Sequence, residues 1–127
     1  MSSDKLQIFR SGNHGNANTT QSAGMQREEL ISRSNSWVGM VHIHPGMVSG
    51  WHHHGDYDSY IYMLSGKARF DFGPEGLESY EASPGDMCYV PKSTVHRETN
   101  IGSQEGVAFL VRVGSGELVF NVDGPEA

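Results

Sequence analysis

Three consecutive histidines, His52, His53 and His54, constrain this chain more than any other feature. Two carboxylates, Asp56 and Asp58, follow within four residues. A packed interior does not tolerate so many polar side chains in a short stretch unless something satisfies them. Imidazoles and carboxylates are also the side chains that bind transition metals, so we expect the chemistry of the chain to lie here.

The residues after the triplet predict that it lies on a strand or just before one. Residues 60–64 are aromatic, β-branched or apolar, and Ser65-Gly66 then reads as a turn. Side chains alternate faces along a strand, and residues two apart stand about 6.5 Å apart on the same side. His52 and His54 can therefore bind one ion while His53 points away. A third ligand must come from elsewhere, and His96, after the apolar run 87–90, is the expected donor.

Two stretches of the chain resemble the paired motifs of the cupin superfamily, G-x5-H-x-H-x3,4-E-x6-G and G-x5-P-x-G-x2-H-x3-N. The first motif matches Gly46, His52, His54 and Gly66, and the second matches Gly85, Pro91, His96 and Asn100. Two spaced motifs in the right order are much stronger evidence than either alone. The resemblance covers about residues 37–122. It implies a jelly-roll barrel, also called a double-stranded β-helix, that holds a divalent metal with its histidines.

The chain departs from these motifs at two positions. Ser93 replaces the internal glycine of the second motif, a mild change if that position does not need a positive φ. The glutamate of the first motif is missing. Counting back from Gly66 places Ser59 there, whereas counting forward from His54 places Asp58 there. We favour Asp58, reached through a small bulge, because a carboxylate binds a divalent ion far better than a hydroxyl. Three histidines completed by water are the alternative.

Length and composition predict one all-β domain over residues 1–127. Hydrophobic residues make up 36% of the chain and glycines number 16, a balance typical of short strands joined by tight turns. About eight or nine strands are expected, including a hairpin of residues 67–72 with 77–82 and a last strand near 118–122. Residues 25–31 could form one helical turn. Residues 1–24 read as a polar arm, in which His14 is expected to face solvent.

The net charge and the lack of targeting signals restrict which partners and which cellular location we expect. The net charge of −6 without a basic cluster argues against nucleic acid. The apolar runs are too short to span a bilayer and the N-terminus lacks the plan of a secretion signal, so we expect no membrane association and a cytoplasmic location. Cys88, the single cysteine, forms no internal disulfide and is expected to be a small buried hydrophobe. A homodimer is the default expectation for a small barrel with exposed edge strands.

Several other side chains have a functional and a structural interpretation. His42 and His44 share one strand face, and the outer face is favoured for both. Trp51 is expected to be a packing anchor. Arg69 and Arg112 are ordinary strand charges unless they face inward, where one would hold a substrate carboxylate. A hydroxyl at the open side of the metal could come from Tyr60 or Tyr62, which are the catalytic candidates.

Taken together, these features predict a metal-dependent enzyme with a small-molecule substrate. The ion is iron, manganese, nickel, copper or zinc, held by His52, His54, His96 and Asp58. A non-haem oxygenase is favoured, with iron(II) as its metal. The alternatives are a metal-dependent isomerase or lyase, such as a dehydratase or decarboxylase of a small keto or sugar acid, and a non-catalytic metal- or ligand-binding module.

Overall fold

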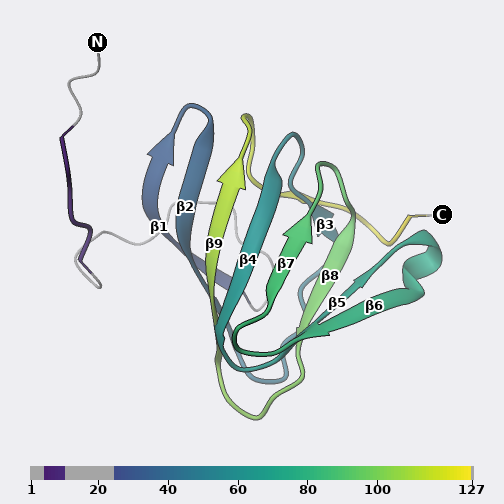
Figure 1. The fold of residues 1–127 in the computed structure, drawn as a ribbon. Coiled ribbons are helices and arrows are strands. Elements are labelled where there is room, and N and C mark those ends of the chain that lie inside the picture. The colour runs from purple at the N-terminus through teal and green to yellow at the C-terminus, as the bar shows by residue number, and fades with distance from the viewer. Residues whose placement is uncertain (1–4, 11–24, 127) are drawn as a thin grey trace.

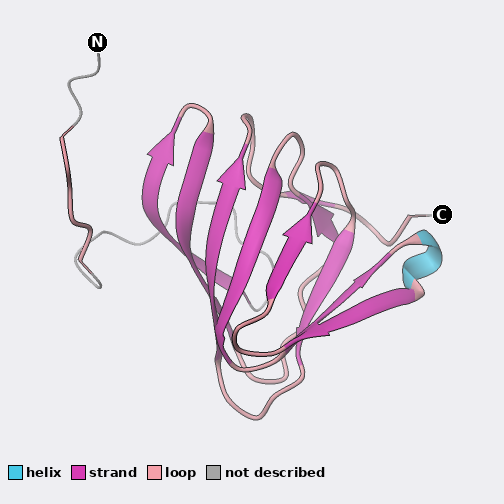
Figure 2. Ribbon diagram, in the orientation of Figure 1, coloured by secondary structure: helices cyan, strands magenta, loops and turns pink. Residues whose placement is uncertain are grey.

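Two antiparallel sheets of five strands each form the fold. The computed structural model describes residues 5–10 and 25–126, and within them the only helical element is a single 3-10 turn (Figure 2). The first sheet has the order β1 (Met25–Arg33), β2 (Ser36–Ile43), β9 (Gly106–Val113), β4 (Asp58–Ser65), β7 (Met87–Val90). The second has the order β10 (Phe120–Asn121), β3 (His52–His53), β8 (His96–Asn100), β5 (Ala68–Phe72), β6 (Glu78–Ala82). The all-β, two-sheet prediction is confirmed (Figure 1).

The core follows from strict alternation along the strands. In β2 and β9 every second residue is buried, so one face of the first sheet packs inward. The apolar members of this face pack with residues of the second sheet, and together they include Trp37, Val41, Ile43, Ile61, Met63, Phe70, Ala108 and Leu110. Burying one such side chain contributes about 1.5–3 kcal/mol, so this interior supplies most of the driving force for folding.

The predicted hairpin forms, with β5 and β6 paired from Ala68 opposite Ala82 to Phe72 opposite Glu78. The η1 turn (Pro74–Gly76) joins the two strands at the tip of the hairpin (Figure 1). The last predicted strand is shorter than expected, since only Phe120–Asn121 pair with another strand, β3. No helix in the described parts of the chain is long and apolar enough to cross a membrane.

The helical turn expected at residues 25–31 is wrong, because β1 occupies Met25–Arg33. Met25 and Arg27 are buried while Gln26 is exposed, which is the two-residue period of a strand. Pairing with β2 along its whole length, from Met25 opposite Ile43 to Arg33 opposite Ser36, outweighs the local helix preference of residues such as Glu28. The expectation for His14 falls outside the described residues.

The interior also contains polar side chains that a simple β-sandwich core lacks. Apart from Asp71, which pairs with Arg69 and Arg97, the charged and imidazole groups among its buried residues are Arg27, Arg112, Glu98, His52, His54 and His96. Arg112 shares the inward face of β9 with Ala108 and Leu110, and Glu98 shares that of β8 with His96 and Asn100. Buried groups of this kind are costly unless they have partners, so their presence marks a functional interior.

Candidate metal centre

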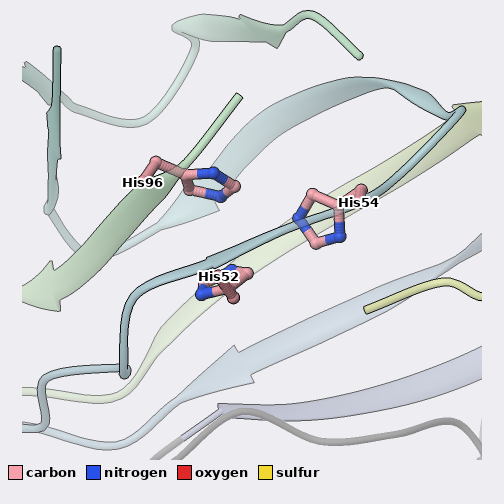
Figure 3. Close-up of side chains that lie close together, drawn as sticks. All are labelled: His52, His54 and His96. Carbon is pink, nitrogen blue, oxygen red and sulfur yellow. The ribbon is translucent and has the colours of Figure 1, made fainter. Parts of the chain in front are cut away.

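Pairing of two strands brings the histidines of the two motifs together. His52 begins β3 and His96 begins β8, and these residues stand directly opposite each other in the antiparallel register. His54 follows β3 on the same side as His52. Figure 3 shows the three rings grouped, two from one segment and the third from the neighbouring strand. The fold thus converts a sequence separation of more than forty residues into direct proximity.

A turn at Ser93 fixes the segment that leads to His96. Ser93 has φ 56°, so the position does need the left-handed conformation that the glycine of the motif would adopt without strain. Its backbone N–H and its hydroxyl both donate to the carbonyl of Gly55, at 2.8 and 3.2 Å. These hydrogen bonds tie the second motif to the residue after His54. They also offset the strain of a serine in the left-handed conformation.

The three imidazoles lie close enough to share one ion. One ring nitrogen from each of His52, His54 and His96 lies within 4.8 Å of the other two. The ring centroids are 4.3 Å apart for His52 and His96, and 5.1 Å apart for each of the other two pairs. All three side chains are buried, with exposed fractions of 0 to 2%. The set of histidines predicted from the motifs therefore forms a possible metal site.

Backbone carbonyls hold the second nitrogen of every ring. Nδ1 of His52, His54 and His96 lies 2.8, 2.7 and 2.9 Å from the carbonyls of Gly50, Leu118 and Thr94. A carbonyl only accepts, so each Nδ1 carries the proton and donates it. Nε2 of His52 and His54 then keeps its lone pair, which is how protein metal sites orient their histidine ligands. Nε2 of His96 instead donates to a carboxylate oxygen of Glu98 at 3.1 Å, and it would lose that proton on binding an ion. The donor arrangement fits a divalent transition metal.

Electrostatics keeps two of these ligands neutral. Burial, together with the charge of His96, lowers the pKa of His52 to about 4. Burial, followed by the charge of Arg112, lowers the pKa of His54 well below its usual value. Nε2 of His52 is buried and has no hydrogen-bond partner among the described residues. A neutral imidazole nitrogen that is buried without a hydrogen-bond partner is costly unless it binds something, and it is well suited to be a metal ligand.

Glu98 stands beside the histidines and was missed at the sequence level. Its Oε1 lies 3.1 Å from Nε2 of His96 and 3.9 Å from Nε2 of His52. Burial opposes its ionisation, but the hydrogen bond from His96 and the charges of His96, His52 and Arg27 lower the pKa of Glu98 to about 2. The available signal was strand parity, since Glu98 lies two residues after His96 and so shares its face.

Asp58, the predicted fourth ligand, is not brought to the histidines. Its carboxylate instead accepts hydrogen bonds from the hydroxyl of Tyr89 and the backbone N–H of Lys92, both at 3.1 Å. The bulge that would have turned Asp58 inward is absent there, because β4 runs in regular register with β9 from Asp58 to Met63 and shifts only between Met63 and Ser65. The inward position belongs to Ser59, which is fully buried.

Tyr60 and Tyr62 also lie away from the three histidines. They alternate with the buried Ser59, Ile61 and Met63, and their exposed fractions are 39% and 37%. The ring of Tyr60 stacks on that of Tyr89 at a centroid distance of 5.4 Å. Neither hydroxyl is therefore placed to serve the metal, and the two tyrosines belong to the outer face of the first sheet.

The remaining polar candidates take structural positions. His53 points away from its two neighbours, as expected, and stacks on Phe120. His42 is outward-facing, 2.8 Å from a carboxylate oxygen of Glu105, and His44 is exposed, which agrees with the favoured interpretation. The guanidinium of Arg97 lies 4.6 Å above the ring of Trp51, a packing contact.

Three further candidates, Cys88, Arg69 and Arg112, differ in their surroundings. Burial, followed by the charge of Glu98, raises the pKa of the Cys88 thiol to about 12, so this cysteine is not a thiolate nucleophile. Arg69 is partly exposed and pairs with Asp71 at 3.2 Å, whereas Arg112 faces inward and is 1% exposed. Of the two arginines, only Arg112 meets the condition set for a substrate contact.

An aromatic-lined cavity reaches the site from the side of β5, β6 and β7. Its volume is about 220 Å³, and His96 forms part of its wall. The other lining side chains are mostly apolar and include Phe70, Phe72, Tyr80, Tyr89 and Val90. This cavity is large enough for a small organic molecule, which could contact the ring of His96 from within it.

Comparison with known proteins agrees with this fold. No curated protein sequence matches the chain. Among solved structures, the polyketide cyclase RemF from Streptomyces resistomycificus superposes with a TM-score of 0.75 at 16% identity, over 94% of this chain and 87% of the cyclase. A conserved double-stranded β-helix protein from Klebsiella pneumoniae gives 0.71 at 18% identity, over 94% and 99%. Bacillus subtilis oxalate decarboxylase gives 0.68 at 20%, over 85% of this chain and 30% of its own.

Structural likeness at these identities shows the fold alone. The family is shown by a separate sequence match, in which residues 39–112 fit the model of the cupin domain. The matched region covers more than half of the chain and contains the three histidines and Glu98. The chain therefore belongs to the cupin family.

Proposed function

We propose that this protein is a metal-dependent enzyme, a non-haem oxygenase that acts on a small organic substrate. The observation that carries the proposal is the set of three buried imidazoles whose Nδ1 atoms all donate to backbone carbonyls. Nε2 of His52 and His54 is thereby left as a lone-pair donor, Nε2 of His96 would become one once its proton leaves, and one ring nitrogen of each histidine lies within 4.8 Å of the other two. Such preorganisation has no purpose in a purely apolar core, but it is what a metal centre needs.

His52, His54 and His96 would hold the metal, with Glu98 as the fourth ligand. A mixed imidazole and carboxylate set suits iron(II) and the neighbouring divalent metals, and four protein ligands leave positions open on a six-coordinate ion. Bound iron(II) supplies the redox chemistry that activates dioxygen. The anionic Glu98 would offset part of the positive charge of the ion in this buried site, since its carboxylate already stands against two of the three imidazoles.

The aromatic cavity would admit the substrate and exclude water. Its walls of Phe70, Phe72 and Tyr80 offer apolar contact to an organic molecule, and His96 forms the boundary with the metal ligands. Desolvation by such walls strengthens every electrostatic contact at the reacting centre. We therefore expect substrates with an apolar portion to bind better than purely polar ones of the same size.

Oxygen uptake by the iron(II)-loaded protein tests the proposal. The protein would be purified without metal, loaded anaerobically, and mixed with dioxygen and a panel of dicarbonyls, catechols and thiols. We expect substrate-dependent oxygen consumption that is lost in His96→Ala and kept in His53→Ala. Iron binding without oxygen consumption for any member of the panel, together with anaerobic turnover of keto acids, would reject the oxygenase in favour of the second candidate.

The second candidate is a metal-dependent lyase or isomerase for a small keto or sugar acid. It is favoured by Arg112, a buried guanidinium whose charge acts on His54. Negative charge that develops on a carbonyl oxygen during decarboxylation or enolisation would be stabilised by such a group. Two solved structures with the same fold, a polyketide cyclase and oxalate decarboxylase, carry names of non-oxygenase activities. If a small molecule binds tightly but is not converted in air or under nitrogen, both enzyme functions are rejected and the protein is a non-catalytic binding module.

A further inference from the structure

Four inward-facing side chains form a row across the first sheet next to the histidines. Trp37 on β2 is paired in register with Arg112 on β9, Arg112 with Ser59 on β4, and Ser59 with Val90 on β7. All four are 5% exposed or less. Residues opposite each other in antiparallel strands have Cβ atoms about 5 Å apart, so Arg112 and Ser59 are immediate neighbours on the inner face.

The two polar members of this row keep donors without a hydrogen bond. Nε and Nη1 of Arg112, and Oγ of Ser59, are buried and form no hydrogen bond with residues 5–10 or 25–126. The guanidinium also contacts an aromatic ring, its Cζ lying 5.2 Å from the centre of the Trp37 ring. The face of an aromatic ring stabilises a cation, but it does not accept conventional hydrogen bonds from the N–H groups at the edge of a guanidinium. The donors of a buried arginine and a buried serine therefore remain available at adjacent positions.

This pair lies beside both the segment that carries His54 and the wall of the cavity. β4 begins four residues after His54, and its first residue, Asp58, is paired with Val113, the residue after Arg112. On the other side of the row, Val90 stands opposite Ser59 and lines the aromatic cavity together with His96. Ser59 and Arg112 do not themselves line the cavity, so a group that reaches them from the cavity would pass the side chains of Val90 and His96.

We propose that Arg112 and Ser59 bind the carboxylate of the substrate, and that this protein acts on small organic acids with an apolar body. The guanidinium and the hydroxyl would donate to the carboxylate while the apolar body fills the aromatic cavity. This inference deepens the proposed function, since it names the substrate class of the same site. Arginine is the residue best matched to a carboxylate, because its planar fork of donors fits the two oxygens.

Glu98 is the obvious competing partner for Arg112, but its carboxylate is already engaged. It is 3.1 Å from His96 and 3.9 Å from His52, and no ion pair within 4.0 Å joins it to Arg112. Arg27 adds a second positive charge, since it acts on both Glu98 and Arg112. Glu98 is thus shared among several positive groups, and an organic acid would supply the acceptor that Nε and Nη1 of Arg112 lack among the described residues.

Binding of benzoate tests the assignment, with benzamide as a neutral molecule of the same shape. Titration calorimetry on the metal-free and the zinc-loaded protein would measure both ligands. We expect benzoate to bind the wild type and to lose affinity on the order of tenfold or more in Arg112→Met, because a charge-assisted hydrogen bond is lost. Ser59→Ala should lose less, and benzamide should bind all three proteins alike. Arg69→Met, which removes a partly exposed arginine of β5, is the matched control and should bind like the wild type.

The thermal midpoint of each variant shows whether it is folded. Arg112→Met should not lower it, because a buried charge whose Nε and Nη1 form no hydrogen bond with the described residues is replaced by an apolar chain of similar length. Ser59→Ala provides a second, smaller change if the methionine variant does not fold. Equal benzoate affinity in wild type and both variants, or no benzoate binding in either metal state, would overturn the inference. Arginine-dependent benzoate binding by a protein that takes up no metal would support it while rejecting the metal enzyme.

Discussion

Oε1 of Glu98 lies 3.1 Å from Nε2 of His96, on the same face of the same strand. The carboxylate that accompanies the three histidines therefore comes from the second motif, whereas the first motif of the family supplies a glutamate that this chain lacks. Ser59 stands at that first-motif position and is buried with its hydroxyl lacking a hydrogen-bond partner in the described chain. In the proposed site the acidic ligand would come from the second sheet, and the inner face of β4 carries the hydroxyl of Ser59 opposite Arg112.

Replacing Glu98 by glutamine tests its role as a ligand. Glu98→Gln removes the negative charge but keeps the size of the side chain, so we expect the affinity for iron(II) or zinc to fall about 10- to 100-fold. Competition with a chromogenic chelator measures this change. Asp58→Asn is the matched control, because that carboxylate is bound to Tyr89 and Lys92 and should not affect the metal. The reverse result, with Asp58 essential and Glu98 dispensable, would assign the fourth ligand to the first motif after all.

Loss of one histidine should release the metal. His96→Ala removes an Nε2 that lies next to those of His52 and His54, so we expect less than one equivalent of metal after dialysis, measured by inductively coupled plasma mass spectrometry. His53→Ala changes a residue of the same triplet whose ring stacks on Phe120 outside the site, and it should retain a full equivalent. Equal metal content in the two variants would show that the ion binds elsewhere.

Much of this arrangement could be predicted from local patterns, and the exceptions have a physical reason. The motif spacing gave the histidines, and alternation gave most strands and the outward position of His42. What failed depended on register. The prediction of Asp58 depends on a bulge near that residue, whereas β4 shifts register only between Met63 and Ser65, and Met25–Arg33 is a strand because β2 pairs with it. Arg112 could not be assigned to the inner face until the end of β9 was fixed against β4. Pairing between distant strands sets register, and no local window of sequence contains it.

Acid should destabilise the metal-free protein. Burial lowers the folded-state pKa of His52 to about 4 from an ordinary 6.5, so below pH 6.5 the unfolded chain binds a proton that the folded chain does not. Stability is then full above that pH and falls as the pH drops toward 4, and His54 acts in the same direction. We expect a loss of about 2 kcal/mol from His52 between pH 7 and pH 5, measured by urea unfolding. A flat profile over this range would contradict the neutral, buried state of these rings. His52→Gln should reduce the slope.

The outer face of the first sheet should bind a second copy of the chain. Tyr62 pairs in register with Phe109 on β9 and with Met87 on β7, and Tyr60 pairs with Tyr89. These side chains are 36 to 58% exposed and form one continuous apolar and aromatic surface. A surface of this kind is uncommon on a monomer, and closed two-fold pairing is the simplest way to cover it. We expect a dimer in sedimentation equilibrium, and a shift to monomer in Tyr62→Lys, which places a charge at its centre. Leu77→Lys, in the exposed η1 turn region, should remain dimeric, and a monomeric wild type at micromolar concentration would refute the assignment.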